Sequence, residues 1–575
     1  MNNKKALYDA KEFRDIREMI NEAVKKYGDN IAFIVKEKQE GEVSYKNITY
    51  KMLQEDINKL GTALIDLGLQ GKRIAIIANN CYEWCLSYLA TLCGVGIVVP
   101  LDKSLPSGEI ESLLQRSHAD AVIFGKGYID IMKDILNNSE NNIEYYISME
   151  KIENDKFLSL QDLQKRGEGL LKKGDTRFEN TIIEPEEMNV ILFTSGTTSA
   201  SKAVMLSQKN LVSNIYALNS VEKMYETDRN LAFLPLHHTF GSTGLLFFLS
   251  NGVSNVFCDG LKYIQKNLQE YHVTVFVCVP LLLEAMNKKI LKEIEKQGKT
   301  KLIKIATRIS NFLLKFGIDI RRKLFKDIIN NLGGLRMAIS GAAAIDKTVV
   351  ENFTNFGIKT VQGYGLTETS PVITAENDES IRYGSVGFPM INVEVKIHKP
   401  NENGIGEIIA KGPNVMLGYY ENEEATKEVL VDGWFHTGDL GYIDKDGFLF
   451  ITGRKKNVIV MKNGKNIYPE ELEVLISKLP YVAENMVFGI PSRDDDLDLA
   501  AKIVYNKEYV EEVFGNISKE ELKEKIWQDI KKINKTMPPY KYIRQIIVTD
   551  EPMIKTTTQK VKRFEEIKKI MREIL

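Results

Sequence analysis

The stretch from Thr194 to Lys202, TSGTTSASK, combines small hydroxyl residues, one glycine and a lysine directly after the apolar run NVILF. Backbone N–H groups of a tight turn and hydroxyl groups can bind phosphate oxygens, and a lysine ammonium adds a positive charge. The candidate phosphate-binding residues are Thr194, Ser195, Gly196, Thr197, Thr198 and Lys202. The composition therefore indicates a phosphate-binding loop, although a Ser/Thr-rich surface turn would read the same way.

The loop is not a Walker-type P-loop. That motif needs a glycine directly before its lysine and a metal-binding hydroxyl directly after it. Here Ser201 precedes Lys202 and Ala203 follows it. The sequence therefore excludes a P-loop kinase.

The elements around the loop alternate between helical and strand patterns. Residues 50–68, YKMLQEDINKLGTALIDLG, have helical spacing and stop at a glycine, and the β-branched runs RIAIIANN, GIVVPLD, TVFVCVP, LRMAISG and IKTVQGYG read as strands. This alternation predicts an α/β fold with mainly parallel sheets. A chain of 575 residues is too long for one hydrophobic core, so at least two domains are expected.

The pattern changes near residue 431. The turn signal Asp446-Gly447 stands before the apolar run FLFI, which indicates an antiparallel hairpin. Short strands and charged helices follow Arg454. We place the domain boundary at GRKK, with an N-terminal domain at 1–455 and a C-terminal domain at 456–575.

Composition limits the classes of partner and compartment. The net charge of −1 gives no overall field for nucleic acid, so no nucleic-acid partner is expected. The five cysteines include no CxxC pair, which favours reduced thiols in a cytoplasmic protein. The N-terminus lacks the apolar core of a signal peptide, and no apolar run is long enough to span a bilayer.

Three further motifs follow the loop in order: GYGLTETSP at 363–371, GWFHTGDLGY at 433–442 and GRKKNVIVMKNGKNIYPEELE at 453–473. Together the four resemble the adenylate-forming superfamily of acyl- and aryl-CoA synthetases, luciferases and peptide-synthetase adenylation domains, from about residue 20 to about 565. The resemblance implies a large N-terminal domain of stacked, mainly parallel sheets with helices, and a small mobile α+β C-terminal lid domain.

The resemblance also implies an ATP site. The loop 194–202 would hold the β- and γ-phosphates, and Thr367 would bind the α-phosphate. Glu368 would hold Mg²⁺, a hard cation that prefers carboxylate oxygen. The adenine would lie between the segment SGAAA, with Gly341, Ala342 and Ala343, and the motif residues Gly363, Tyr364 and Gly365.

The later motifs imply the sugar site and a domain rotation. Asp439 would accept hydrogen bonds from both ribose hydroxyls, and Arg454 would reach the same sugar. Lys456 matches the hinge position. The signature KTTTQKVKR at 555–563 sets Lys560 as the catalytic lysine, which would bridge the carboxylate and the α-phosphate. After rotation, Gly464, Lys465 and Asn466 would line the side that the thiol of CoA enters.

Four positions depart from the family pattern. Ser199, Ser201 and Ala203 replace Gly, Pro and Gly in the loop, and Gln559 replaces the Gly before the catalytic lysine. If position 199 needs a positive φ, serine there costs about 1 kcal/mol. These departures leave two hypotheses: a working enzyme, and a catalytically weak relative that binds nucleotide or lipid.

The segment FLPLHHTFGSTG at 233–244 matches the family segment beside the substrate carboxylate. His238 takes the position of the active-site histidine, with Phe240 and Gly241 lining the acyl pocket, although a lone histidine is often structural. No charged residue stands nearby for a second polar group on the substrate. This favours a plain apolar acid.

A basic segment at 288–326 holds thirteen Lys/Arg against three Asp/Glu. Its apolar residues Leu302, Ile305, Ile309, Phe312, Leu313 and Phe316 fall on one helical face. Two interpretations stay open: peripheral contact with an anionic membrane, and a helical hairpin that packs its apolar face on the body. An insertion at this place resembles those of long-chain acyl-CoA synthetases.

The leading hypothesis is therefore a long-chain fatty acid–CoA ligase that uses ATP, Mg²⁺ and CoA. A rival with the same chemistry passes the acyl group to an acyl carrier protein. A luciferase-type oxygenase shares the first half-reaction.

Overall fold

The computed structural model describes residues 6–39, 41–137, 141–152, 156–194, 201–341, 343, 345–461, 465–491, 497–555 and 560–574. The chain forms two compact units. Unit 1 comprises the residues up to 194 together with 202–395 and 410–435, and unit 2 comprises 396–409 and the residues from 436 onward. The domain division predicted above, 1–455 and 456–575, stays a prediction.

The first sheet of unit 1 has eight strands in the order β19-β9-β8-β4-β3-β5-β6-β7. Strands β4, β3, β5, β6 and β7 run parallel, and β9 returns antiparallel to β8. The strands are β3 (Lys72–Ile77), β4 (Gly96–Pro100), β5 (Ala121–Phe124), β6 (Tyr145–Ser148), β7 (Leu158–Ser159), β8 (Met188–Thr194), β9 (Lys202–Ser207) and β19 (Gly418–Tyr419).

The second sheet of unit 1 has nine strands in the order β16-β15-β14-β13-β12-β10-β11-β1-β2. The inner strands from β14 to β1 are parallel, and antiparallel strands close both edges. The strands are β1 (Ile31–Gln39), β2 (Glu42–Thr49), β10 (Arg229–Ala232), β11 (Ser254–Phe257), β12 (Val275–Cys278), β13 (Met337–Ser340), β14 (Lys359–Gly365), β15 (Val372–Ala375) and β16 (Phe388–Pro389). The mainly parallel α/β fold predicted from the sequence is confirmed.

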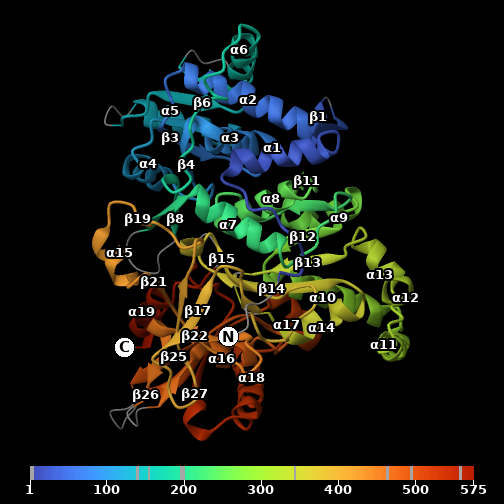
Figure 1. Cartoon of the computed structure of the whole chain (residues 1–575). Helices are drawn as coiled ribbons and strands as arrows, with labels where there is room; N and C mark the ends of the chain where they lie inside the picture. Colours follow the sequence, from blue (N-terminus) through green and yellow to red (C-terminus); the bar gives the residue numbers. More distant parts are fainter. Residues whose placement is uncertain are drawn as a thin grey trace. The chain divides into compact units, whose positions relative to one another are not determined.

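Helices pack between and around these sheets (Figure 1). The predicted helix at 50–68 is α2 (Tyr50–Asp66). It begins because the side chain of Thr49 accepts a hydrogen bond from the N–H of Met52, and it buries Leu53, Ile57 and Leu60 on one face. One large core cluster joins α2 to α3 and α8 and to strands of both sheets. The other helices of unit 1 are α1 (Ile16–Tyr27), α3 (Tyr82–Ala90), α4 (Ser107–Arg116), α5 (Ile129–Asn137), α6 (Leu160–Lys172), α7 (Gln208–Asn219), α8 (Thr239–Ser250), α9 (Ile264–Glu270), α10 (Pro280–Lys296), α11 (Thr300–Leu314), α12 (Arg321–Leu324), α13 (Lys326–Asn331), α14 (Lys347–Asn355) and α15 (Glu423–Val429).

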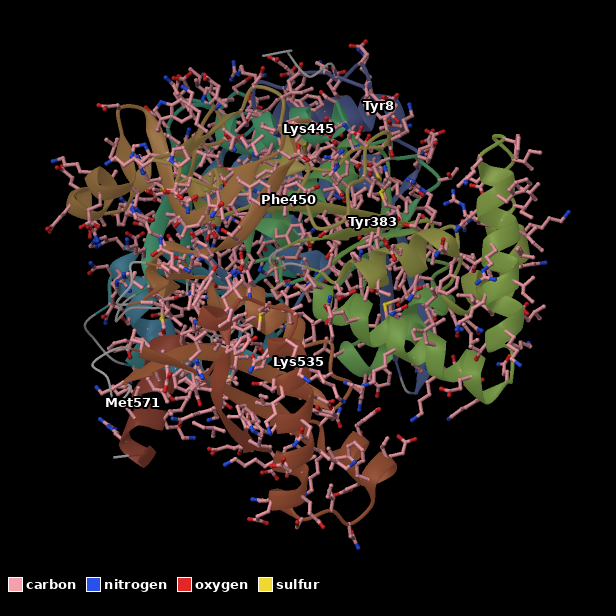
Figure 2. All side chains as sticks on the ribbon, turned by 90° about the horizontal axis from the view of Figure 1, so that it is seen from below. Tyr8, Tyr383, Lys445, Phe450, Lys535 and Met571 are labelled. Carbon is pink, nitrogen blue, oxygen red and sulfur yellow. The ribbon has the colours of Figure 1, made fainter. Side chains whose placement is uncertain are left out.

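Unit 2 contains most of a five-stranded sheet, ordered β17-β18-β21-β20 with β22 paired to β21. The hairpin predicted at Asp446-Gly447 is confirmed, since it joins antiparallel β21 and β22. Across it the rings of Tyr442 and Phe450 (Phe450 is labelled in Figure 2) stack with centroids 5.0 Å apart. The strands are β17 (Glu394–His398), β18 (Gly406–Lys411), β20 (Leu430–Val431), β21 (Trp434–Ile443) and β22 (Leu449–Arg454).

The rest of unit 2 is a small α+β assembly, as the resemblance implied. Helices α16 and α18 pack on a three-stranded sheet, ordered β25-β26-β27, around one buried apolar cluster. A two-stranded sheet pairs β23 with β24. These elements are β23 (Ile459–Val460), β24 (Asn466–Ile467), α16 (Pro469–Ile476), β25 (Val482–Pro491), β26 (Leu497–Tyr505), α17 (Lys507–Phe514), α18 (Lys519–Asn534), β27 (Ile543–Thr549) and α19 (Arg563–Ile574). Among the described residues, no helix has the length and apolar character needed to cross a membrane.

Candidate functional site

The two described ends of the candidate phosphate loop face each other at the end of a strand pair. Thr194 closes β8, Lys202 opens β9, and the two residues are cross-strand partners. The Oγ1 hydroxyl of Thr194 donates to the carbonyl oxygen of Lys202 at 3.3 Å. The antiparallel pairing therefore fixes where the loop leaves and rejoins the sheet. The predicted residues Ser195, Gly196, Thr197 and Thr198 lie outside the described residues.

Tyr419 connects Lys202 to Glu368. Its hydroxyl donates to Oε1 of Glu368 at 2.9 Å, and Nζ of Lys202 lies 4.5 Å from the centre of its ring. Burial, together with the negative charge of Glu368, raises the pKa of Tyr419 well above its usual value, so the phenol stays a donor. No motif used above pointed to Tyr419, because its role depends on β19 pairing with β9.

The residues beside Glu368 hold it in place from outside the motif. Amides from two distant asparagines, Asn214 and Asn414, donate to the carbonyl oxygen of Thr369 at 3.2 and 3.1 Å. The N–H of Met416 donates to the carbonyl oxygen of Glu368 at 2.9 Å. The turn Thr367–Thr369 is thus fixed by two separate segments, one at Asn214 and one at 414–416, although sequence spacing could not reveal these partners.

The carboxylate of Glu368 suits a magnesium ion. Mg²⁺ is commonly held by one or two carboxylates together with substrate phosphates. Tyr419 donates to one oxygen of Glu368, and among the described residues no hydrogen bond or ion pair engages the other oxygen. Lys202 and Glu368 both approach Tyr419, so the phosphate-loop lysine and the candidate metal ligand belong to one local arrangement.

The predicted adenine-binding residues belong to β14 and to the segment after β13. Tyr364 is buried in β14 between Gly363 and Gly365. A Cβ atom at Gly365 would lie 1.7 Å from the carbonyl oxygen of Pro371, so only glycine allows this close backbone approach. Ala343 is exposed, and Ala342 lies outside the described residues.

Gly341 brings the adenine segment against the acyl segment. A Cβ atom at Gly341 would lie 2.8 Å from Cζ of Phe240, so the ring of Phe240 rests directly on this glycine. Gly341 and Phe240, about one hundred positions apart in the sequence, are therefore in direct contact. The sequence did not predict this contact, and the adenine and acyl roles of the two residues stay predictions.

His238 precedes α8 and sits beside a second histidine and an acid. The rings of His237 and His238 have centroids 4.3 Å apart, and Nε2 of the buried His237 lies 3.3 Å from Oδ1 of Asp102. That distance suits an ion pair, but its geometry does not make a hydrogen bond, and Nε2 has no hydrogen-bond partner. Asp102 was not among the predicted residues, because it follows β4, far from His237 in sequence.

Asn80 fixes the backbone before the two histidines. Its Nδ2 donates to the carbonyl oxygens of Ala232 and Leu234 at 3.2 and 2.7 Å, and its Oδ1 accepts from the N–H of Leu236 at 3.2 Å. An amide side chain can satisfy both kinds of backbone group at once. Asn80 is thus another positioning residue that the sequence did not reveal.

A small apolar cavity of about 10 Å³ opens beside the predicted acyl residues. Its wall includes Gly241, Leu245, Phe248 and Val277. A Cβ atom at Gly241 would lie 2.3 Å from the carbonyl oxygen of Pro235, so the first turn of α8 can approach this loop only with glycine. The cavity has about the volume that one water molecule requires, so a larger ligand could enter it only if side chains moved.

In unit 2, Asp439 and Arg454 form a cross-strand ion pair. They are partners in the β21–β22 register, with Nε of Arg454 2.7 Å from Oδ1 of the buried Asp439. The N–H of Asp439 donates to Oγ1 of Thr437 at 3.0 Å, and that hydroxyl donates to the carbonyl oxygen of Ile408 at 2.7 Å. These hydrogen bonds hold the HTGD motif, and the β21–β22 pairing places the guanidinium of Arg454 beside its carboxylate.

Lys456 and Lys560 are both exposed in unit 2. Lys456 lies in the short turn Lys455–Asn457 directly after β22. Lys560 precedes Val561, which pairs with Lys555 in an isolated antiparallel bridge. Glu566, buried and paired with Lys502, accepts a hydrogen bond from the N–H of Ile554 at 2.9 Å and so anchors the backbone next to Lys555.

The predicted thiol-side residues are partly described. Gly464 lies outside the described residues. Lys465 places Nζ 4.2 Å from the centre of the Tyr540 ring, and Asn466 pairs with Val460 in the β23–β24 sheet. Asp439, Arg454, Lys456, Lys465, Asn466 and Lys560 belong to unit 2, and the other described candidates belong to unit 1. Their meeting in one site stays a prediction.

Comparison with known proteins identifies relatives over most of the chain. The family model described as AMP-binding enzyme matches residues 20–420, and the model described as AMP-binding enzyme C-terminal domain matches 456–574. A protein of Arabidopsis thaliana named long-chain-fatty-acid--[acyl-carrier-protein] ligase, chloroplastic, is 27% identical, over 98% of this chain and 86% of its own. A protein of Mus musculus named long-chain-fatty-acid--CoA ligase 5 is 30% identical, over 91% of this chain and 82% of its own.

Among solved structures, an anthranilate CoA ligase in complex with anthranoyl-AMP superimposes with a TM-score of 0.75. The match covers 98% of this chain and 99% of that one at 20% sequence identity. At this identity the likeness establishes the fold.

Proposed function

The chain belongs to the AMP-binding enzyme family, and we propose on that premise that it joins a long-chain fatty acid to coenzyme A with cleavage of ATP to AMP and pyrophosphate. The observation that carries the proposal is the arrangement of Lys202 and Glu368 around Tyr419. Lys202, the candidate phosphate-binding cation, and Glu368, the candidate metal ligand, both contact one side chain, which supports binding of a metal–triphosphate complex.

In the first half-reaction, a carboxylate oxygen of the fatty acid attacks the α-phosphorus. The bond from that phosphorus to the oxygen of the leaving pyrophosphate breaks, giving an acyl-adenylate. Lys202 and the loop would hold the β- and γ-phosphates, and Thr367 would donate to the α-phosphate. Glu368 would hold Mg²⁺, whose charge offsets that of the phosphates. Lys560 would contact the attacking carboxylate and the α-phosphate.

In the second half-reaction, the thiolate of coenzyme A attacks the acyl carbonyl carbon, and AMP leaves. Asp439 and Arg454 would hold the ribose throughout. A rotation at Lys456 would withdraw Lys560 and bring the segment of Gly464, Lys465 and Asn466 to the thiol side. Hinges of this kind need only a few residues that absorb a large change in φ and ψ.

The acid-binding side supports an apolar substrate with one carboxylate. His238 stands at the N-terminus of the twelve-residue helix α8, where the helix dipole favours a negative group. The small cavity beside Gly241 is lined in part by Leu245, Phe248 and Val277. The names of the Arabidopsis and mouse relatives agree with a long-chain acid.

An acyl carrier protein is the second candidate acceptor, because the Arabidopsis relative is named as a ligase for that carrier. Both acceptors present a thiol to the same adenylate. The two functions differ only in which acceptor raises the rate of AMP release.

The test uses purified protein with Mg·ATP and hexadecanoate, and it follows pyrophosphate and AMP separately. The proposed function predicts that both products form and that CoA raises AMP release. Stimulation by carrier protein alone would assign the second function. If the protein binds ATP but no acid of any chain length gives pyrophosphate, it is a non-catalytic binding protein and the proposal is wrong.

A further inference from the structure

Helix α11 carries an apolar stripe that faces solvent. The stripe consists of Leu302, Ile305, Ile309 and Phe312 on the helix and of Phe316 just after its last residue, Leu314, and every one of these side chains is exposed. Phe312 is 59% exposed and Phe316 67%. Their rings contact each other edge to face with centroids 5.2 Å apart, and most of each side chain stays exposed. The interpretation in which this face packs on the body is therefore wrong for these five residues.

A different face of α11 attaches the helix to unit 1. Ile303 and Ala306 pack on a buried cluster of Ile294, Phe325 and Phe356. Ser310 is buried, and Nδ2 of Asn311 donates to Oδ1 of Asn355 at 2.9 Å, which ties α11 to α14. The outer stripe is thus not the unfilled remainder of a core, because the helix already has an inner apolar face.

The side chains flanking the stripe are basic. Lys301, Lys304, Arg308 and Lys315 are exposed, and α11 contains no acidic residue. Within the described part of the chain, no carboxylate forms an ion pair with any of these four. A helix with a basic flank and an exposed stripe of large apolar residues has the composition of interfacial helices that lie on anionic bilayers. Figures 1 and 2 show α11 in yellow-green.

We propose that the outer face of α11 binds an anionic lipid bilayer, with Leu302, Ile305, Ile309, Phe312 and Phe316 in the acyl region and the neighbouring Lys and Arg side chains at the headgroups. The charge decides the occupant. A second copy would bring two basic faces together, and nucleic acid offers nothing to cover a stripe of Ile and Phe. The proposal does not depend on the ligase reaction, since it concerns adsorption of the whole chain to a surface.

The experiment measures co-sedimentation of the full-length protein with vesicles of phosphatidylcholine alone and of phosphatidylcholine mixed with phosphatidylserine. Two variants test the two components of the face: Ile309→Asp with Phe312→Asp, and Lys301→Gln with Lys304→Gln and Arg308→Gln. The matched controls change exposed residues elsewhere in unit 1. They are Ile182→Asp with Leu261→Asp, and Lys25→Gln with Lys46→Gln and Lys173→Gln.

The wild type should bind the mixed vesicles and lose binding as salt is raised. The triple Gln variant should lose affinity on the order of 100-fold, since each basic residue near the surface contributes about a fivefold factor. The double Asp variant should fail to bind, and both controls should bind like the wild type. Circular dichroism and the thermal midpoint establish that each variant is folded, which is expected because every changed side chain is exposed.

Three results would overturn the proposal. The first is equal binding to vesicles with and without phosphatidylserine. The second is binding by folded α11 variants that matches the wild type. The third is a wild type that binds no vesicles but does bind an acidic protein such as an acyl carrier protein, when the triple Gln variant has lost binding of that protein. That last result would assign the face to a protein partner. Because vesicle binding is read without ATP or CoA, failure here leaves the ligase test unaffected.

Discussion

Asp439 and Arg454 stand directly opposite each other on β21 and β22, with Nε of Arg454 2.7 Å from Oδ1 of Asp439. The carboxylate is buried, while the side chain of Arg454 is 40% exposed. If the pair holds the ribose of ATP, Asp439→Asn should raise the KM for ATP on the order of 10- to 100-fold, because hydrogen bonds to charged groups contribute about 1.5–3 kcal/mol.

Replacing ATP by 2′-deoxy-ATP separates this role from a structural one. The wild type should discriminate against the deoxy nucleotide, and Asp439→Asn should not. Asp446→Asn removes a charge from the turn of the same hairpin and serves as the control, with kinetics expected to match the wild type. Undiminished discrimination in Asp439→Asn, together with a lower thermal midpoint, would show that the pair only stabilises the hairpin.

Tyr419→Phe removes the hydroxyl that donates to Glu368 and keeps the ring beside Lys202. We expect kcat/KM for Mg·ATP to fall by about tenfold, which corresponds to one hydrogen bond to a charged group. The magnesium concentration for half-maximal rate should also shift. Tyr420→Phe is the adjacent control. An unchanged magnesium dependence in Tyr419→Phe would mean that this phenol does not position the metal ligand.

Lys560→Ala should separate the two half-reactions. If Lys560 stabilises charge as the carboxylate attacks, pyrophosphate release should fall by at least 100-fold. Transfer from chemically prepared acyl-adenylate to CoA should remain near the wild-type rate. Lys562→Ala, two residues away and paired with Glu565, is the control. Equal losses in both half-reactions would contradict the proposed role and indicate damage to the fold of unit 2.

The pH dependence of stability should report on Glu376 in unit 1. Burial raises its pKa to about 7, against the hydrogen bonds that it accepts from the N–H groups of Arg382 and Gln362. A carboxyl group whose pKa is raised by folding stabilises the protein at pH values below its unfolded-state pKa. This contribution disappears as the pH rises through its folded-state pKa of about 7. Stability of unit 1 should therefore fall by up to about 3 kcal/mol between about pH 4.5 and about pH 7.

Glu376→Gln tests this directly, since it cannot ionise. The variant should lose a pH-independent amount of stability. The Gln side chain has one acceptor oxygen, and its NH₂ group cannot accept the hydrogen bond from the second N–H group. Its thermal midpoint should then lack the decline that the wild type shows over that range. The same decline in the variant would assign the pH dependence to other groups.

Local patterns predicted the elements and many of the candidate residues. The helix at 50–68, the parallel strands and the hairpin at Asp446-Gly447 follow from periodicity and turn chemistry, which are properties of short segments. Motif order carried the superfamily assignment. The basic character of 288–326 was also visible, and so was its apolar face.

Contacts between distant segments could not be predicted in the same way. Tyr419 reaches Glu368 only because β19 pairs with β9, and Asp102 approaches His237 only because β4 ends near the start of α8. Asn80, Asn214 and Asn414 act through backbone groups, which leave no trace in side-chain spacing. The direction of the α11 stripe depended on which face the neighbouring helices cover, and periodicity alone leaves that open.

The most direct test of the proposed ligase function is pyrophosphate and AMP release by the purified full-length protein with Mg·ATP and hexadecanoate, with and without CoA. We predict pyrophosphate release that requires the fatty acid, and AMP release that rises when CoA is added. Absence of pyrophosphate with short, medium and long acids, from a protein that still binds ATP, would contradict the proposed chemistry and place the chain among non-catalytic members of its family.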